Sequence, residues 1–365
     1  MANKKFFNPA KLAVYYHPGE FLSETISEQG MSVKEFAIRT GKPEKTIHAI
    51  ISGKSLITDD MALAFEKVTH VPAHFWMNKQ HNYDAYRSRK RAEEKERNLI
   101  AWVKNFPYKE MVENGWIEPS IDALGKVTNL LRFFRIDSDE AWEDLYYNSK
   151  LKVSYRISLK NSKNPYALSA WLRYGEILAE KESVETDYSQ VKLMQMLPTL
   201  LDIIYSHPKD FAEQVKKLLN HCGIKIVYIK HLPKAPVSGC VRWIQDIPCI
   251  MLTDRQKRYD IICFSLLHEI AHILKHGKKD VFIESEGLNI PQKEQEAEDF
   301  ARQMLLPHRA IESIVGDGNF SYSNIYRISI KYHVNPSVLV GALIHDNIIS
   351  YKTHGKLLKQ QTLIS

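Results

Sequence analysis

The first part of the chain alternates short segments of helical apolar spacing with single glycines and prolines. Between residues 31 and 54, apolar side chains recur at helical spacing on both sides of Gly41. Ser32 and Glu35 form an S-x-x-E capping box, which predicts a helix start. Gly41 supplies the positive φ of a tight turn, and Pro43 suits the first turn of the next helix. The pattern therefore predicts a helix-turn-helix unit.

Two more helices are predicted to pack against this unit. Thr58 is placed to cap the downstream helix. Its apolar face is expected from Met61, Ala64, Phe65 and Val68, and that of the upstream helix from Phe21, Leu22, Thr25 and Ile26. Together these segments predict a small helical bundle at the N-terminal end.

The pattern changes near residue 224. Up to residue 220, amphipathic segments predict helices around 121–134, 167–182 and 191–205. Three β-branched runs then predict strands, at Ile224–Ile229, Gly239–Ile244 and Pro248–Leu252, with a turn at Gln245–Ile247 between the last two. Either of these last two strands could lie at the edge or in the centre of a sheet.

An almost wholly apolar helix is predicted from about Tyr259 to His276, with Gly277 as the residue that ends it. A second helix is predicted from Gln292 to about Leu306, and further helices from 321 to 350. The predicted fold class is α+β and mostly helical. The predicted domains are a helix-turn-helix bundle at 1–82, a helical connector at 83–165, and a domain with a small sheet at 166–365.

Composition adds constraints on location and partners. No apolar run approaches the roughly 20 residues of a membrane span, and no secretory signal is evident. The four cysteines show no CxxC spacing, so we expect a cytoplasmic chain with reduced thiols and no membrane partner. The net charge is +7, and residues 1–97 hold 16 Lys/Arg against 12 Asp/Glu. The cluster Arg87-Ser-Arg-Lys-Arg91 is compatible with nucleic-acid binding.

Residues 17–90 resemble the HigA-type antitoxins of the XRE helix-turn-helix family. The resemblance is carried by residues 31–54 and by four further stretches: His17–Leu22, Leu56–Ala62, His74–Asn78 and Asn82–Tyr86. It implies binding to operator DNA as a homodimer. It also implies groove-facing side chains at Ser32, Lys42, Glu44, Lys45, Thr46 and His48, and phosphate contacts from Lys54, Arg87, Arg89, Lys90 and Arg91. Val33 and Glu44 depart from the usual polar pattern of the family.

The stretch Leu266–Gly277 contains His268, Glu269 and His272 in the spacing H-E-x-x-H. Residues i and i+4 share a helix face, so both imidazoles can bind one tetrahedral Zn²⁺. Glu269 is placed to take a proton from water as it attacks a carbonyl group. Burying these polar residues in an apolar helix without partners would be costly. The pattern therefore favours a zinc peptidase over core histidines that happen to be buried.

A third ligand is expected from the helix that follows. The apolar residues Ala297, Phe300, Ala301 and Met304 define its buried face. At about 100° per residue, Glu294 lies roughly 60° from the centre of that face, whereas Glu296 and Glu298 lie roughly 100° away. Glu294 is the predicted third ligand, and Glu296 is the alternative. His276, one turn beyond His272, is predicted to be a hydrogen-bond partner of a ligand or an alternative ligand.

The motif His268–His272 followed by Glu294–Pro307 resembles the ImmA/IrrE metallopeptidase family, with Glu298 where Asn or Asp is usual. Ala170–Glu176 and Ser238–Trp243 also recur in fusions of this peptidase to a HigA-like region. The resemblance implies a zincin-like fold and zinc-dependent cleavage of a repressor or antitoxin in a toxin–antitoxin, mobile-element or phage-defence circuit. The alternative function is a HigA-like antitoxin or transcriptional repressor whose zinc domain is a sensor or scaffold.

Overall fold

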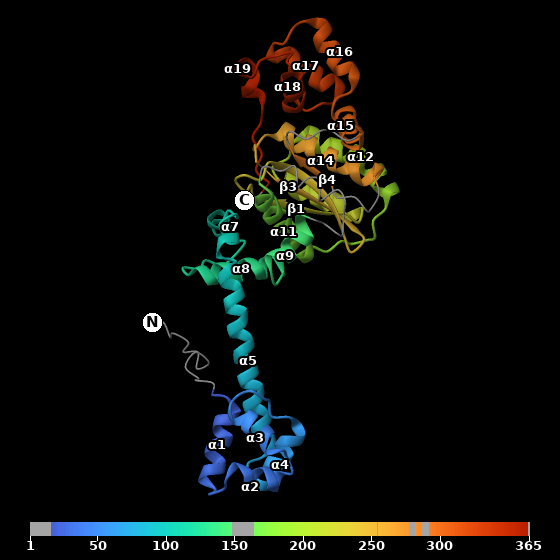
Figure 1. Cartoon of the computed structure of the whole chain (residues 1–365). Helices are drawn as coiled ribbons and strands as arrows, with labels where there is room; N and C mark the ends of the chain where they lie inside the picture. The colour runs from blue at the N-terminus through green and yellow to red at the C-terminus, as the bar shows by residue number, and fades with distance from the viewer. Residues whose placement is uncertain (1–15, 148–163, 254, 277–281, 286–291, 364–365) are drawn as a thin grey trace, which may run out of the picture. The chain divides into compact units, whose positions relative to one another are not determined.

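The computed structural model describes residues 16–147, 164–253, 255–276, 282–285 and 292–363 (Figure 1). The chain divides into two compact units, one up to Asn98 and one from Leu99 onward. The residues predicted to form a connector are shared between them: 83–98 complete a helix of the first unit, and 99–147 belong to the second. Gly277 lies outside the described residues.

The first unit contains the predicted helix-turn-helix. Its helices are α1 (Pro18–Glu28), α2 (Val33–Thr40), α3 (Glu44–Ile51), α4 (Asp59–Thr69) and α5 (Ala73–Asn98). The Ser32 hydroxyl accepts a hydrogen bond from the Glu35 N–H at 3.1 Å, and Gly41 adopts the left-handed conformation at φ 64° between α2 and α3. The Glu35 carboxylate pairs with Arg39 at 2.6 Å. Local sequence signals therefore set both ends of α2, the first helix of the helix-turn-helix.

A single aromatic and aliphatic core holds these helices together. Phe36, Ile47, Phe65 and Trp76 are all fully buried. The ring centroids of Phe36 and Phe65 lie 5.1 Å apart, and those of Phe65 and Trp76 lie 5.6 Å apart. Beyond this core, the second half of α5 is polar and largely exposed, as expected for a helix that packs on little else.

The second unit is built on a sheet with the strand order β1-β3-β2-β4. The strands are β1 (Lys225–Ile229), β2 (Val237–Ile244), β3 (Ile247–Thr253) and β4 (Phe282–Ser285). β1 is parallel to β3, and β2 is antiparallel to both β3 and β4. The three predicted strands and their turn are confirmed, with positive φ at Gln245 and Asp246. Both candidate edge strands, β2 and β3, are interior because β1 and β4 flank them, and β4 was not predicted.

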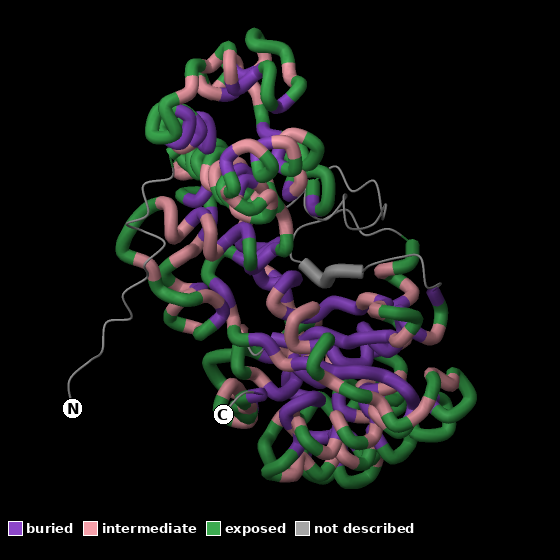
Figure 2. Tube along the Cα trace, turned by 90° about the horizontal axis from the view of Figure 1, so that it is seen from below, coloured by how far each residue is buried: buried purple, intermediate pink, exposed green. Residues whose placement is uncertain are grey.

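Helices cover both faces of this sheet (Figures 1 and 2). α14 (Tyr259–Lys275) packs on the face that carries Ile226 and Ile250. α11 (Pro165–Lys181) packs on the opposite face, which carries Val227 and Met251. Alternate residues of β1, β2 and β3 thus enter different cores, so these three strands are buried on both sides. The four cysteines are also buried and form no disulfide.

The remaining helices extend these two layers. The helices that share a core with α11 are α6 (Ile100–Val103), α7 (Tyr108–Glu113), α8 (Ala123–Phe134), α9 (Asp139–Trp142) and the π-helical turn η2 (Glu143–Tyr147). The helices that share a core with α14 are α12 (Gln190–Ser206), α13 (Phe211–His221), α15 (Gln292–Leu305), α16 (His308–Asp317), α17 (Tyr322–Tyr332) and α18 (Pro336–His345). Two short elements follow, α19 (Tyr351–His354) and η3 (Gly355–Leu357).

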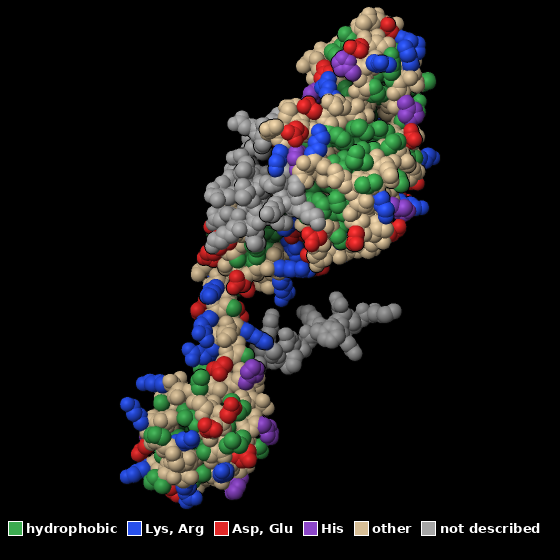
Figure 3. Space-filling view, turned by 90° about the vertical axis from the view of Figure 1, so that its right-hand side faces the viewer, with side chains coloured by type: hydrophobic (Ala, Val, Ile, Leu, Met, Phe, Trp, Pro, Cys, Tyr) green, Lys and Arg blue, Asp and Glu red, His purple; other side chains and the backbone are tan. Residues whose placement is uncertain are grey.

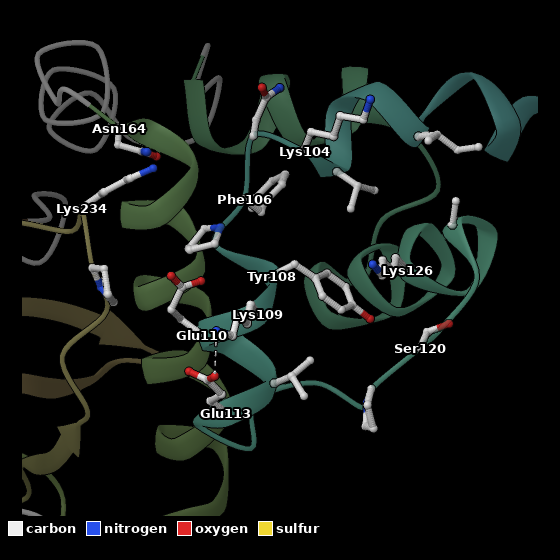
Figure 4. A pocket seen from close by; sticks show the side chains of 18 residues that line it. Lys104, Phe106, Tyr108, Lys109, Glu110, Glu113, Ser120, Lys126, Asn164 and Lys234 are labelled. Atoms are coloured by element: carbon white, nitrogen blue, oxygen red, sulfur yellow. Dashed lines mark ion pairs between the residues drawn. The ribbon is translucent and has the colours of Figure 1, made fainter.

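A cavity of about 760 Å³ lies beside α7 and α8 (Figure 4). Phe106, Tyr108, Lys104 and Lys126 are among the side chains that line it. None of its lining residues comes from α14 or α15. It is therefore separate from the H-E-x-x-H helix.

An ion-pair network joins two stretches that are far apart in the sequence. Glu176 on α11 pairs with Arg173 at 2.8 Å and also with Arg242 on β2. The Arg173 Nε donates to the carbonyl oxygen of Phe133 on α8 at 2.9 Å. The side chain of Glu176 is 13 % exposed. The network therefore connects α11, α8 and the sheet within a mostly dry layer.

Glu176→Ala is expected to destabilise the protein because two guanidinium groups lose their shared carboxylate. Breaking a buried pair costs about 3–5 kcal/mol, and partial exposure of Glu176 favours the lower end of that range. Urea unfolding of the full chain would measure it. Glu180→Ala is the matched control, since Glu180 is 37 % exposed, pairs with Arg135 and lies 3.4 Å from Arg173; we expect a loss of about 1 kcal/mol or less. Equal losses would contradict this account.

Candidate metal centre

The packing of α14 against α15 brings three potential metal ligands together. His268 and His272 lie one turn apart on α14, and their Nε2 atoms are 3.0 Å apart. From α15, the Glu294 Oε2 lies 3.1 Å from the Nε2 of His268 and 3.5 Å from that of His272. These ligand atoms form a cluster that could hold a metal ion.

The spacing of the cluster fits a tetrahedral zinc site. Ligand atoms about 2.0–2.2 Å from Zn²⁺ at tetrahedral angles lie about 3.3–3.5 Å from one another. The separations of 3.0, 3.1 and 3.5 Å come close to this. Two imidazoles and one carboxylate are also a donor set found in catalytic zinc sites, which leave a fourth position for water or substrate.

The protonation states of the cluster suit metal binding. Burial lowers the pKa of His272 to about 4. Burial would raise the pKa of Glu294, but His268 and His272 face its carboxylate and hold the pKa at about 2. At neutral pH the imidazole is therefore neutral and the carboxylate ionised, which are the forms that bind a metal ion.

His276 and Glu296 extend the cluster behind His272. The Nδ1 atoms of His272 and His276 lie 2.9 Å apart, and the His276 Nε2 lies 3.4 Å from the Glu296 Oε2. If the His276 Nε2–H donates to Glu296, the His276 Nδ1 can accept a hydrogen bond from the Nδ1–H of His272. The Nε2 lone pair of His272 is then directed into the cluster. The structure thus brings both alternative ligands of the sequence prediction to the back of His272.

Glu269 lies on the side of α14 that faces the sheet. Its side chain is fully buried and packs against Gly239 of β2. The sequence prediction identified Glu269 but missed Gly239. A glycine inside a strand was the available signal, because it often marks a close approach by another group.

The shifted pKa of His272 predicts a pH-dependent stability for the metal-free protein. The unfolded chain takes up this proton near pH 6.5, but the folded chain does so only near pH 4. Between these values the unfolded state binds more protons, so stability falls as the pH drops from about 6.5 to about 4. Urea midpoints of EDTA-treated protein should fall across this window. His272→Gln should flatten the slope, and an unchanged slope would contradict the assignment.

The predicted groove-facing residues gather around α3. Glu44, Lys45 and His48 are exposed on this helix, while Lys42 and Thr46 are half-buried. The His48 Nε2 lies 3.7 Å from the Glu44 carboxylate. The remaining groove-facing candidate, Ser32, is exposed at the start of α2, where its hydroxyl caps the helix.

The predicted phosphate contacts lie on two segments. Lys54 is exposed in the turn after α3. The other four are exposed along α5: Arg87, Arg89, Lys90 and Arg91. Figure 3 shows several Lys and Arg side chains, in blue, along this helix. Lys90 also lies 3.6 Å from Glu93. The predicted phosphate contacts therefore lie on other segments of the first unit than the groove-facing residues of α3.

The fold and these clusters define a two-part protein, in which a helix-turn-helix unit precedes a metallopeptidase-like domain. Residues 220–340 match the family model Peptidase_M78, described as the IrrE N-terminal-like domain. The chain thus joins a helix-turn-helix unit to a segment that matches the IrrE-like family model. In the described part of the chain, no helix is both long and apolar enough to cross a membrane.

Similar proteins match the helix-turn-helix region. The HTH-type transcriptional regulator YddM of Escherichia coli (strain K12) is 29 % identical over 70 residues, which are 19 % of this chain and 74 % of that protein. An addiction module antidote protein of a HigA family from Coxiella burnetii is 33 % identical, with 22 % of this chain and 89 % of that chain covered and a TM-score of 0.21. A protein described as an antidote of a plasmid maintenance system, from Nostoc punctiforme, is 25 % identical over 23 % of this chain and 93 % of that one, with a TM-score of 0.23.

Proposed function

We propose that this protein is a DNA-binding regulator that carries a zinc-dependent endopeptidase. Its substrate is a regulatory protein, either a repressor or an antitoxin, of a toxin–antitoxin, mobile-element or phage-defence circuit. The observation that carries this proposal is the convergence of His268, His272 and Glu294 beside Glu269 in an IrrE-like domain. The resemblance to regulators and antidote proteins supports the class of substrate.

Each residue of the centre has a distinct role in this proposal. His268, His272 and Glu294 would hold the zinc ion, which supplies a Lewis acid for polarising a peptide carbonyl and lowering the pKa of water. Glu269 accepts the proton of the attacking water and returns it to the leaving amine. His276 and Glu296 hold His272 in the tautomer that presents its Nε2 lone pair.

A second candidate function is a HigA-like repressor whose zinc domain senses or scaffolds with little turnover. The burial of Glu269, His268 and His272 favours it, because each has 2 % exposure or less. A substrate must reach the base of a peptidase, and Glu269 has no exposed surface.

Cleavage of the adjacent gene product separates the two functions. Purified protein with stoichiometric zinc would be incubated with that product, and fragments would be identified by mass spectrometry. Zinc-dependent fragments that disappear with a chelator support the peptidase. Retained zinc without any fragment would reject the peptidase and favour the scaffold.

DNA binding is tested at α3. Lys45→Ala is expected to weaken binding to the protein's own promoter DNA by about 1–3 kcal/mol if Lys45 contacts a base edge. Lys67→Ala is the matched control, because Lys67 is an exposed lysine on α4 of the same unit. Fluorescence anisotropy at several salt concentrations would measure both variants. Equal losses would show a general charge effect and contradict the placement of α3 in the groove. A concentration-dependent doubling of mass would test the proposed homodimer.

A further inference from the structure

The backbone of β2 comes unusually close to the proposed catalytic base. A Cβ atom added at Gly239 would lie 2.5 Å from the Glu269 Oε1, 3.0 Å from its Cγ and 3.1 Å from its Cδ. These distances are shorter than ordinary van der Waals contacts, which are about 3.4–4 Å. Only a residue without a side chain therefore fits opposite Glu269.

Neither partner in this contact has room to move away. Glu269 is 0 % exposed, so its side chain cannot swing out into solvent. Turning the carboxylate alone would not relieve the contact, because the Cγ atom is also within 3.0 Å. On the other side, Gly239 pairs with Leu252 in an interior strand. The ladder hydrogen bonds resist a shift of its backbone.

The strand is also irregular at this point. Between β2 and β4, Val237 pairs with Ser285 and Cys240 pairs with Ile283, so β2 has one extra residue there. Such a β-bulge redirects the strand locally, and bulges are frequent beside active sites. The bulge spans Ser238 and Gly239, and Gly239 is the residue that approaches the Glu269 side chain.

We infer that Gly239 is a positioning residue that fixes the Glu269 carboxylate relative to the metal ligands. The inference rests on the proposed peptidase function. A methyl group at residue 239 would displace the base while leaving His268, His272 and Glu294 in place. Gly239→Ala should therefore lower the cleavage rate and leave the zinc affinity unchanged. Displacement of a catalytic group by about 1 Å can lower a rate by about 100-fold.

Two glycine variants serve as matched controls. A Cβ at Gly175 would lie 2.5 Å from the Met251 Sδ, on the opposite face of the same sheet, so Gly175→Ala introduces a similar clash away from Glu269. A Cβ at Gly316 on α16 would meet nothing within 4 Å. Gly316→Ala therefore measures the effect of the exchange without a clash.

The experiment uses the full-length zinc-loaded protein and a proteome-derived peptide library as the substrate probe. Gly239→Ala is expected to keep its zinc affinity and lose about 100-fold in cleavage rate. Its Tm should fall by about 2–6 °C, as overpacking predicts. Gly175→Ala should lower the Tm and retain cleavage. Gly316→Ala should retain cleavage and should not lower the Tm, because alanine is the better helix former. Wild-type cleavage by Gly239→Ala would overturn the inference.

A double-mutant cycle tests the contact without any cleavage assay. In a Glu269→Ala background the side chain that a Cβ would meet is gone, so adding Gly239→Ala should leave the Tm unchanged. An equal fall in Tm in both backgrounds would overturn the inference. A wild-type protein that cleaves no peptide would instead reject the proposed peptidase, and the Tm cycle alone would then decide whether Gly239 sets the position of Glu269.

Discussion

Glu269→Gln is expected to keep zinc and to lower the cleavage rate by about 10²–10⁴-fold, the range that a general base contributes. Glutamine has nearly the shape of glutamate, so it should fit the buried space against Gly239. It cannot take the proton of the attacking water. The effect should therefore appear in kcat, with the zinc affinity and the Tm close to those of the wild type.

The matched control is Glu298→Gln, the same exchange on α15 outside the ligand cluster. It should cleave at the wild-type rate. Zinc content by mass spectrometry under native conditions and initial rates on the adjacent gene product would compare the three proteins. If Glu269→Gln cleaves like the wild type, then another group accepts the proton, and the assigned role of Glu269 is wrong.

Much of the fold could be predicted because its signals are local. The Ser32 cap and the left-handed Gly41 set the helix-turn-helix, and both appear in the structure as predicted. The apolar periodicity of α14 and α15 gave their positions to within one residue at either end. Helix phase alone favoured Glu294 over Glu296 and Glu298, and the Glu294 carboxylate lies 3.1 Å from the Nε2 of His268; its role as a ligand stays a prediction.

The order of strands could not be predicted, because it depends on pairings between distant segments. β2 and β3 read as strands from their own residues, but nothing in those residues shows that β1 and β4 flank them. The same holds for Gly239. The sequence shows a glycine in a strand, and only the folded chain shows which side chain lies opposite. Likewise α5 continues as a polar helix past residue 82, where the predicted helix-turn-helix domain ends.

Replacing each of the three glutamates of α15 by alanine should lower the zinc affinity to a different extent. Glu294→Ala removes a ligand atom from the cluster. We expect it to weaken zinc binding by more than the 10–100-fold typical of losing a partner that hydrogen-bonds to a ligand. Glu296→Ala acts one step further from the ion, because Glu296 faces His276 at 3.4 Å, and it is His276 that faces the ligand His272. The effect of Glu296→Ala should therefore be at most about 10–100-fold.

Glu298→Ala is the control of this series. Like the other two exchanges it replaces one glutamate of α15 by alanine, but Glu298 does not belong to the ligand cluster. Competition with a chromogenic zinc chelator would rank the three variants at pH 7. The order Glu294, then Glu296, then Glu298 follows from their contacts: Glu294 faces both imidazoles of the cluster, Glu296 faces only His276, and Glu298 is outside the cluster. If Glu296→Ala lost more zinc than Glu294→Ala, the bound ion would sit against His276 rather than between His268 and His272. The geometry argues against that, because the Glu294 carboxylate lies 3.1 Å from the Nε2 of His268 and 3.5 Å from that of His272.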